Sequence, residues 1–368
     1  MIINNKKNVR FLNLSLKNKK EKAIYLNAIS KVLDHGYLVM GPEIELLENK
    51  ISIFCKRKYC ISANSGTDAL YLAIKSLGYE PGSEVITSSL SWIATANAIS
   101  LNHLTPVFCD IGYDLNMDPG NIESLISNKT KAILAVNYTG KICDMDKLIS
   151  ICKKNKIDLI EDGSQSFGAK YKGRINGSFG KISAISHNPM KVFGALGESG
   201  SILVDQSRLR EKLISLRYNG TINKEKCIYP SLNGRMDTIQ AAVLIEKMKL
   251  LKSVIKKRRT NASYYSSELN NILELPIEKK YEKDVYYTYT IKSDKRNKLM
   301  NYLNQKGIET KIQHPLLMPQ QPAYKKNVKG SFKNAEKIIK TVLCIPIHEN
   351  LKESELEYVT KVIKSFYG

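Results

Sequence analysis

Short runs of β-branched and aromatic residues alternate with helical patterns along the first half of the chain. The strand-like runs cover 58–64, 83–89, 105–111, 131–136 and 157–163. Between them, apolar residues recur every three or four positions in 65–78, 92–103, 118–128 and 144–156, the spacing that places one apolar face on a helix. Strands that alternate with helices predict a mostly parallel sheet covered by helices on both faces.

The pattern changes after residue 180. Two strand-like runs, 180–186 and 200–206, are separated by too little chain for a crossover helix, so they predict an antiparallel pair. A long helical region covers about 235–270, and an aromatic-rich strand follows at 284–292. We therefore expect a large α/β domain, residues 1–250, with a seven-stranded sheet, and a smaller C-terminal α+β domain, residues 251–368.

The composition narrows the class of protein. No apolar run approaches the roughly 18 residues that a membrane helix needs, and the charged N-terminus has no apolar core typical of a secretory signal. The seven cysteines are scattered without a CxxC pair, which argues against a zinc site or a disulfide framework. We expect a cytoplasmic protein with no membrane partner and no metal.

The formal net charge of +22 raises the question of a polyanionic partner. The densest basic stretch, 247–260, has aliphatic residues at helical spacing, so it fits the solvated face of a helix as well as a nucleic-acid contact. No helix-turn-helix, zinc-finger or RNA-binding signature accompanies it. A basic surface that attracts a small phosphorylated substrate is therefore favoured over nucleic acid.

In a parallel sheet, ligands bind at the carboxyl ends of the strands, and four features stand there. Gly66 and Thr67 begin a helix and fit either a phosphate site or an ordinary cap. Asp162 ends a buried strand, where a carboxylate needs a cationic partner or caps a turn. Trp92 stacks on an aromatic ring or belongs to the core. Lys191, in "SHNPMKVFGALGESG", is either a surface lysine or an amine that forms a Schiff base with an aldehyde.

Taken together, the four features match what pyridoxal 5'-phosphate requires of a protein. These requirements are a phosphate cradle, an aromatic stack, a partner for the protonated pyridine nitrogen and a Schiff-base lysine. Each lies at a strand end of the same domain. The combination favours the functional alternative at each position over the structural one.

The motifs "NSGTDALYLAIKSLG", "SEVITSSLSWIATANAI", "LIEDGSQSFGAKYKG", "SHNPMKVFGALGESG" and "NGRMDTIQAAVL" also form a recognisable series. The chain resembles the DegT/StrS family of sugar aminotransferases over roughly residues 25–360. The resemblance implies a fold type I pyridoxal-phosphate enzyme, with the fold of aspartate aminotransferase. It further implies amino transfer from L-glutamate to a nucleotide-linked keto-deoxy sugar in surface-glycan biosynthesis.

The same resemblance implies a role for each matched position. Lys191 would hold the cofactor as a Schiff base and move the proton, and Asp162 would pair with the pyridine nitrogen. The remaining cofactor contacts would be Gly66, Thr67, Trp92, Gln165, Ser186 and, from the neighbouring subunit of a homodimer, Asn233. Tyr37 and His314 are the candidate substrate contacts.

The segment 312–324, "IQHPLLMPQQPAY", departs from the family pattern. Gln313 and Pro319 stand where two histidines are usual, and His314 stands where a tyrosine is usual. This departure keeps open a smaller phosphorylated acceptor, such as dihydroxyacetone phosphate to give serinol phosphate. Two further alternatives are a sugar dehydratase, which carries histidine in place of Lys191, and a non-catalytic basic binding or regulatory protein.

Overall fold

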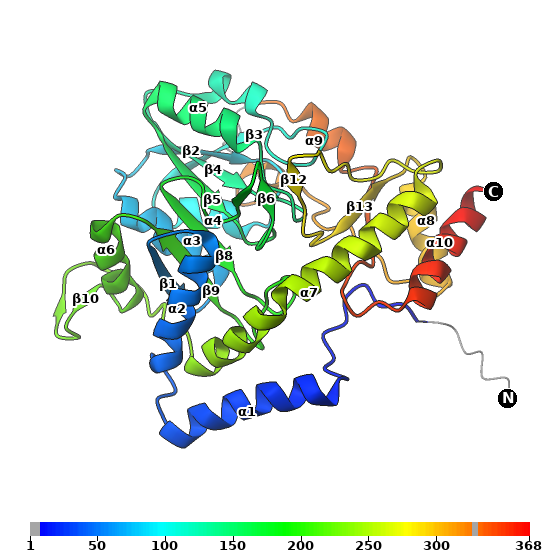
Figure 1. Cartoon of the computed structure of the whole chain (residues 1–368). Helices are drawn as coiled ribbons and strands as arrows, with labels where there is room; N and C mark the ends of the chain where they lie inside the picture. Colours follow the sequence, from blue (N-terminus) through cyan, green and yellow to red (C-terminus); the bar gives the residue numbers. More distant parts are fainter. Residues whose placement is uncertain (1–7, 326–329) are drawn as a thin grey trace.

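The computed structural model describes residues 8–325 and 330–368, and its centre is a seven-stranded sheet (Figure 1). The sheet has the order β1-β9-β8-β5-β4-β2-β3. Its strands are β1 (Tyr59–Ala63), β2 (Glu84–Ser88), β3 (Thr105–Cys109), β4 (Thr130–Val136), β5 (Asp158–Asp162), β8 (Ile182–Ser186) and β9 (Gly200–Val204). Only β9 runs against its neighbours, pairing antiparallel with both β1 and β8. The predicted mostly parallel sheet and its one antiparallel element are confirmed.

Helices cover both faces of this sheet. They are α2 (Pro42–Cys55), α3 (Gly66–Leu77), α4 (Ala94–Ser100), α5 (Met145–Asn155), α6 (Ser207–Arg217) and α7 (Thr238–Leu269). The first helix, α1 (Lys19–His35), packs against α7. Along β4, Leu134 packs with α3, α4 and α6, whereas its neighbour Ile133 packs with α5 on the opposite face. Successive residues of a strand point to opposite faces, so a continuous apolar run serves two helical layers. The helices α2 and α7 cover β1, β8 and β9 on the α5 face.

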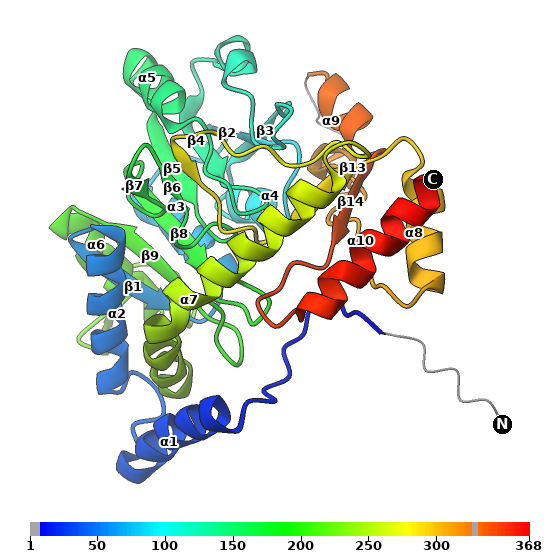
Figure 2. The same ribbon diagram turned by 45° about the vertical axis from the view of Figure 1, so that its right-hand side comes forward.

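A second core lies beyond the middle of α7, which passes diagonally from the sheet to this part of the molecule (Figures 1 and 2). It contains β13 (Tyr289–Lys292), paired antiparallel with β14 (Val342–Ile345), and the helices α8 (Arg296–Gln305) and α10 (Glu353–Tyr367). Val9 packs into this second core. Because α7 continues through residue 250 and the N-terminal segment contacts the second core, the division at 250 stays a prediction.

The short elements complete the described chain. They are β6 (Lys170–Tyr171), β7 (Arg174–Ile175), β10 (Thr221–Ile222), β11 (Lys226–Cys227), β12 (Glu282–Lys283), α9 (Lys333–Ile338) and the 3-10 turns η1 (Pro119–Asn121), η2 (Glu123–Leu125) and η3 (Met318–Gln320). The helix predicted at 118–128 is wrong, because only two 3-10 turns form there. The Asp118 carboxylate accepts from the backbone N–H of Gly120 and from the Asn121 side chain, and such local bonds compete with an α-helix.

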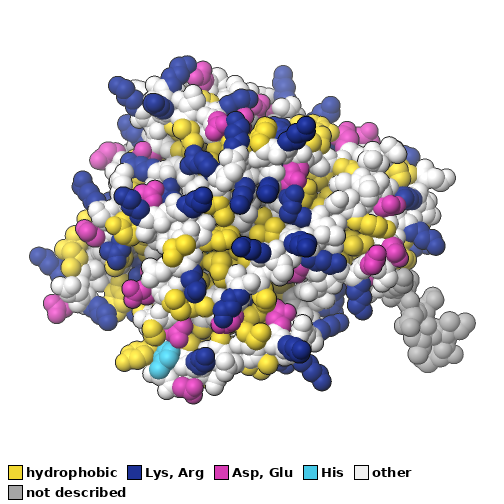
Figure 3. Space-filling model, viewed as in Figure 1, with side chains coloured by type: hydrophobic (Ala, Val, Ile, Leu, Met, Phe, Trp, Pro, Cys, Tyr) yellow, Lys and Arg dark blue, Asp and Glu magenta, His cyan; other side chains and the backbone are white. Residues whose placement is uncertain are grey.

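Basic and acidic side chains are mixed on the face of the molecule seen in Figure 3. Lysine and arginine side chains lie over the whole face seen in Figure 3, with acidic side chains among them. The basic stretch 247–260 lies on α7. In the described part of the chain, no helix is both long and apolar enough to cross a membrane.

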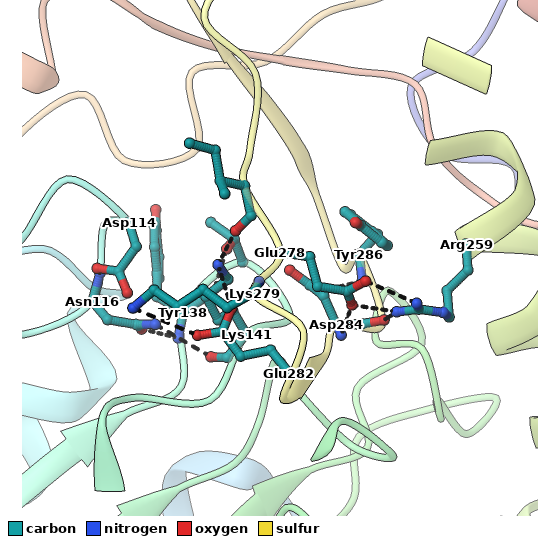
Figure 4. Close-up of polar contacts among 12 residues, drawn as sticks. Asp114, Asn116, Tyr138, Lys141, Arg259, Glu278, Lys279, Glu282, Asp284 and Tyr286 are labelled. Atoms are coloured by element: carbon teal, nitrogen blue, oxygen red, sulfur yellow. Dashed lines mark hydrogen bonds and ion pairs between the residues drawn. The ribbon is translucent and has the colours of Figure 1, made fainter. Parts of the chain in front are cut away.

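A partly buried polar cluster joins the loop after β4 to the segment that precedes β13 (Figure 4). Lys141 and Glu282 form an ion pair of 3.1 Å with both side chains 7% exposed. Arg259 donates to Glu278 at 2.9 Å, and burial raises the pKa of Asp284 to about 7. These contacts hold the backbone of 284–288, which carries Tyr287, against the sheet.

Gly140 lies where the loop after β4 and the segment that precedes β13 approach each other closely. Its carbonyl accepts from the N–H of Val285 at 3.2 Å. A Cβ at Gly140 would lie 2.5 Å from Asp284 Oδ1 and 2.6 Å from the backbone nitrogen of Tyr287. Its φ of +117° is also a conformation that side chains rarely adopt.

We predict that Gly140→Ala lowers the free energy of unfolding by about 2–4 kcal/mol, because it adds steric overlap to backbone strain. Gly82→Ala is the matched control, since Gly82 has φ +82° with nothing near its missing Cβ, and we expect it to cost about 1 kcal/mol. Urea unfolding of both variants measures the difference. Equal losses would show that the junction is not tightly packed.

His187 lies in the core beneath the end of β8. It is fully buried, its Nε2 is 2.8 Å from Ser201 Oγ, and its ring lies edge-on to Phe167 and Phe193. Burial lowers the pKa of His187 to about 4. The side chain therefore stays neutral in the folded protein while the unfolded chain titrates near pH 6.5.

This difference predicts a loss of stability in acid. As the pH falls below about 6.5, the unfolded chain takes up a proton that folded His187 rejects, so unfolding becomes more favourable until the folded pKa is reached. We expect the drop in unfolding free energy between pH 7 and pH 5 to be about 2 kcal/mol smaller in His187→Gln than in the wild type. Urea unfolding at both pH values tests this. His103→Asn, a substitution at an exposed histidine, is the control. An unchanged drop in His187→Gln would contradict the assignment.

Candidate active site

A cavity of about 310 Å³ opens at the carboxyl ends of β1, β5 and β8. Ligands bind at this edge of open α/β sheets. Eight of the ten predicted site residues line the cavity: Gly66, Thr67, Trp92, Asp162, Gln165, Ser186, Lys191 and His314. The topology thus brings together residues that are up to 248 positions apart, from Gly66 to His314.

The first turn of α3 forms one wall of the cavity. Ser65 caps the helix, its Oγ accepting from the N–H of Asp68 at 3.0 Å. Gly66 and Thr67 follow as the first helical residues, so their N–H groups have no partner within the helix. A Cβ at Gly66 would lie 2.3 Å from the Cβ of Ser186. The missing side chain therefore lets the helix terminus and the Ser186 hydroxyl meet, an arrangement that favours an anion.

Two adjacent carboxylates at the end of β5 have different environments. Glu161 is fully buried, and its two oxygens accept from five groups: the side chains of Asn137, Asn176 and Ser183 and the backbone N–H groups of Gly177 and Phe179. Burial raises its pKa. A carboxylate with all its acceptor positions occupied holds structure together and has no capacity left for a ligand.

Asp162 points to the cavity with fewer partners. Its Oδ1 accepts from the N–H of Ser164 at 3.0 Å, and its Oδ2 has only a long contact of 3.4 Å with Thr95 Oγ1. Burial raises the pKa of Asp162, while the hydrogen bonds of Ser164 and the charge of Lys191 act in the opposite direction. A cationic N–H donor in the cavity would complete this carboxylate.

Lys191 lies in the turn that follows β8, and its backbone N–H donates to Asn188 O at 2.8 Å. Gly194 keeps this turn tight, because a Cβ there would lie 2.6 Å from Asn188 O. The Nζ of Lys191 lies 4.7 Å from the centre of the Tyr287 ring. The amine is half-buried inside the cavity, which a surface hairpin lysine would not be.

Two polar groups face the cavity from its other sides. Gln165 is buried and uses its Oε1 to accept from the N–H of Thr139 at 3.0 Å, so its amide N–H groups remain as donors. His314 Nδ1 lies 2.6 Å from the hydroxyl of Tyr138. Burial lowers the pKa of His314 to about 3, with a further contribution from the charge of Lys191. His314 is therefore a neutral hydrogen-bonding group in the wall of the site.

Trp92 stands at the mouth of the cavity, 60% exposed, with its ring centre 6.0 Å from that of His314. A core tryptophan would be buried, so the exposed position agrees with a stacking role.

Asn233 and Tyr37 lie outside the cavity of their own chain. Asn233 Oδ1 accepts from Arg235 Nε at 2.7 Å, and Tyr37 is 66% exposed. Their assigned roles stay predictions.

Several cavity residues were not among the predicted ones. Thr95 and Ser164 lie within three residues of Trp92 and Asp162, so a wider search around each strand end finds them. Tyr287 and Lys311 come from the second half of the chain. No local sequence pattern indicates these two residues, because the expectation that ligands bind at the carboxyl ends of strands applies only to the large sheet.

Comparison with known proteins identifies the relatives of this fold and site. The sequence model of the DegT/DnrJ/EryC1/StrS aminotransferase family matches residues 19–364. The chain is 33% identical over 360 residues to the dTDP-3-amino-3,6-dideoxy-alpha-D-galactopyranose transaminase of Aneurinibacillus thermoaerophilus, covering 97% of this chain and 99% of that protein. It is also 32% identical over 367 residues to a pleiotropic regulatory protein of Geobacillus stearothermophilus, covering 98% and 99%.

A solved structure gives the same result. The crystal structure of NtdA from Bacillus subtilis, with its bound cofactor PMP, superimposes with a TM-score of 0.91 at 31% identity, covering 97% of this chain and 85% of that one. The match spans both the sheet and the second core, so it includes every wall of the cavity. The chain belongs to the DegT/DnrJ/EryC1/StrS aminotransferase family.

Proposed function

We propose that this protein is a pyridoxal-phosphate aminotransferase that moves the amino group of L-glutamate to a nucleotide-linked keto sugar, in surface-glycan biosynthesis. One observation carries the proposal. Three groups face one cavity: a lysine amine, a buried carboxylate whose hydrogen bonds are incomplete, and a helix terminus suited to an anion. The named transaminase among the relatives acts on a dTDP-linked sugar, which supports the class of acceptor.

The residues present fit the cofactor group by group. The α3 terminus and Ser186 would hold its phosphate, since Gly66 allows the helix terminus and the Ser186 hydroxyl to lie side by side. Asp162 would accept from the pyridine N–H, the cationic donor that this buried carboxylate lacks. Gln165 would donate its free amide to the ring hydroxyl oxygen, and Trp92 would cover the ring. When bound, pyridoxal phosphate supplies an electron sink for the carbon that loses its proton.

The protein's own groups perform the proton transfers. Asp162 would keep a proton on the ring nitrogen, because its negative charge in a buried site favours the cationic form. Lys191 Nζ would bond the cofactor at rest, and as a free amine it would take a proton from the substrate carbon and return it. The same amine serves the donor and the acceptor, since both substrates enter one cavity in turn.

We also infer that the working form is a homodimer. Residues 37–40, Tyr-Leu-Val-Met, are all exposed, and Trp92 is exposed as well. A run of exposed apolar side chains is typical of a surface that another chain covers. A second copy on this surface would agree with the predicted contribution of Asn233 to the neighbouring site.

The alternatives have less support. A dehydratase of this family needs histidine at position 191, and His187 is enclosed in the core with both ring nitrogens near protein acceptors or donors. Dihydroxyacetone phosphate remains a candidate acceptor because of the altered segment 312–324. One relative is named as a regulatory protein. A non-catalytic role is therefore the alternative outcome of the experiment below.

The absorption spectrum of protein incubated with pyridoxal phosphate tests the function. We expect a visible band that changes on addition of L-glutamate, and we expect neither the band nor the change in Lys191→Ala, which has no amine to bond the cofactor. Lys153→Ala, an exposed position on α5, is the control. Acceptors are then screened with keto sugars and triose phosphates in parallel. A wild-type protein that takes up no cofactor would favour the binding or regulatory function.

The two carboxylates at the end of β5 separate function from stability. We predict that Asp162→Asn folds with normal stability but transaminates at least about 100-fold more slowly, because it no longer holds the ring-nitrogen proton. Glu161→Gln should lower the free energy of unfolding by about 2–4 kcal/mol, because its NH₂ group faces donors. Single-turnover kinetics and urea unfolding of both variants measure this. The assignment fails if the two substitutions have the same effects.

A further inference from the structure

Lys311 lies in the wall of the cavity, and hydrogen bonds hold its backbone in place. Its N–H donates to Cys344 O at 3.1 Å, and its carbonyl accepts from the N–H of Cys344 at 2.8 Å. These two bonds attach the residue to β14 as an isolated bridge. The side chain is left to line the cavity beside His314.

The ammonium group of Lys311 has no counter-ion among the described residues. No ion pair or side-chain hydrogen bond of this group occurs there, and the side chain is exposed and lines the cavity. Two carboxylates line the cavity. Asp162 is assigned to the cofactor, and Glu198 accepts from the Asn188 side chain. The positive charge of Lys311 is therefore available to a ligand.

Every amino donor brings at least one carboxylate into this cavity, and glutamate brings two. A carboxylate in a confined site is costly unless a cation pairs with it. Of the described residues that line the cavity, Lys191 and Lys311 are the cations, and none is an arginine. Lys191 is committed to the cofactor and the proton, and His314 is neutral.

We propose that Lys311 is the residue that binds a carboxylate of the amino donor. The inference rests on the proposed function, because it needs an amino acid in the cavity. Lys311 lies in the part of the chain that follows α7, whereas the cofactor contacts from Gly66 to Lys191 belong to the large sheet and its connections.

The rival cation is Arg235, which lies outside the cavity of its own chain. It donates to Asn233 and stacks on Tyr218 at 4.5 Å. In the proposed homodimer Arg235 would accompany Asn233 toward the neighbouring site. The donor carboxylate then has two candidate partners that substitution can separate.

The test follows the donor half-reaction alone, by the change in absorption of the bound cofactor at increasing L-glutamate. We expect Lys311→Gln to raise the half-saturating glutamate concentration roughly tenfold to hundredfold, the cost of one charge-assisted hydrogen bond, with a smaller change in the limiting rate. Lys311→Arg should recover most of the affinity. Lys298→Gln, an exposed position on α8, removes the same charge elsewhere and should have no effect.

L-alanine distinguishes the two carboxylates. If Lys311→Gln weakens glutamate and alanine equally, Lys311 binds the α-carboxylate; if it weakens only glutamate, Lys311 binds the side-chain carboxylate. Both results support the proposal. Unchanged saturation in Lys311→Gln together with a loss in Arg235→Gln overturns it in favour of the neighbouring subunit.

A binding measurement removes the dependence on chemistry. Glutarate has two carboxylates and no amino group, so it binds without reacting. It should raise the melting temperature of the wild-type holoenzyme and raise that of Lys311→Gln less. An equal rise in both proteins counts against Lys311. A wild-type holoenzyme that binds glutarate but reacts with no amino acid overturns the proposed function and the donor assignment with it.

Discussion

The contact between the first turn of α3 and the end of β8 is the constraint on which the site depends. Gly66 touches Ser186 so closely that any Cβ would overlap it. The contact brings a helix terminus, which follows β1, next to the turn that carries Lys191. Since β9 separates β1 from β8 in the sheet, neither strand pairing alone would bring these groups together. The absence of one side chain thus sets the position of the helix terminus, the proposed anion site, relative to the amine.

The pair Glu161 and Asp162 shows how environment divides the roles of neighbouring residues. Their side chains project to opposite faces of β5, as successive residues of a strand must. Glu161 accepts hydrogen bonds from donors in 176–183, so its carboxylate is fully paired within the protein. Asp162 meets the cavity, where one oxygen has only a 3.4 Å contact. The same type of charge therefore stabilises the fold at one position and remains available to a ligand at the next.

Much of the sheet and of the cofactor side could be predicted because both depend on local pattern. The alternation of apolar runs determines the strands, and the residues just after β1, β5 and β8 include Gly66, Asp162 and Ser186. The helix expected at 118–128 was wrong because Asp118 satisfies the local backbone better than a helical turn does. Tyr287 was missed for a different reason. It reaches the cavity through contacts between 139–140 and 285–288, a pairing across more than 140 residues that no periodicity reports.

This separation has a consequence for specificity. The groups that fit the cofactor belong to the large sheet, whereas Tyr287, Lys311 and His314 reach the cavity from the second half of the chain. These residues are carried by backbone that is fixed by hydrogen bonds to the Thr139–Gly140 loop or to β14, so their side chains can differ without disturbing the anion site or Asp162. A departure such as 312–324 therefore changes what the cavity accepts and leaves the amine chemistry intact. For the same reason, family membership alone specifies the reaction more firmly than it specifies the sugar.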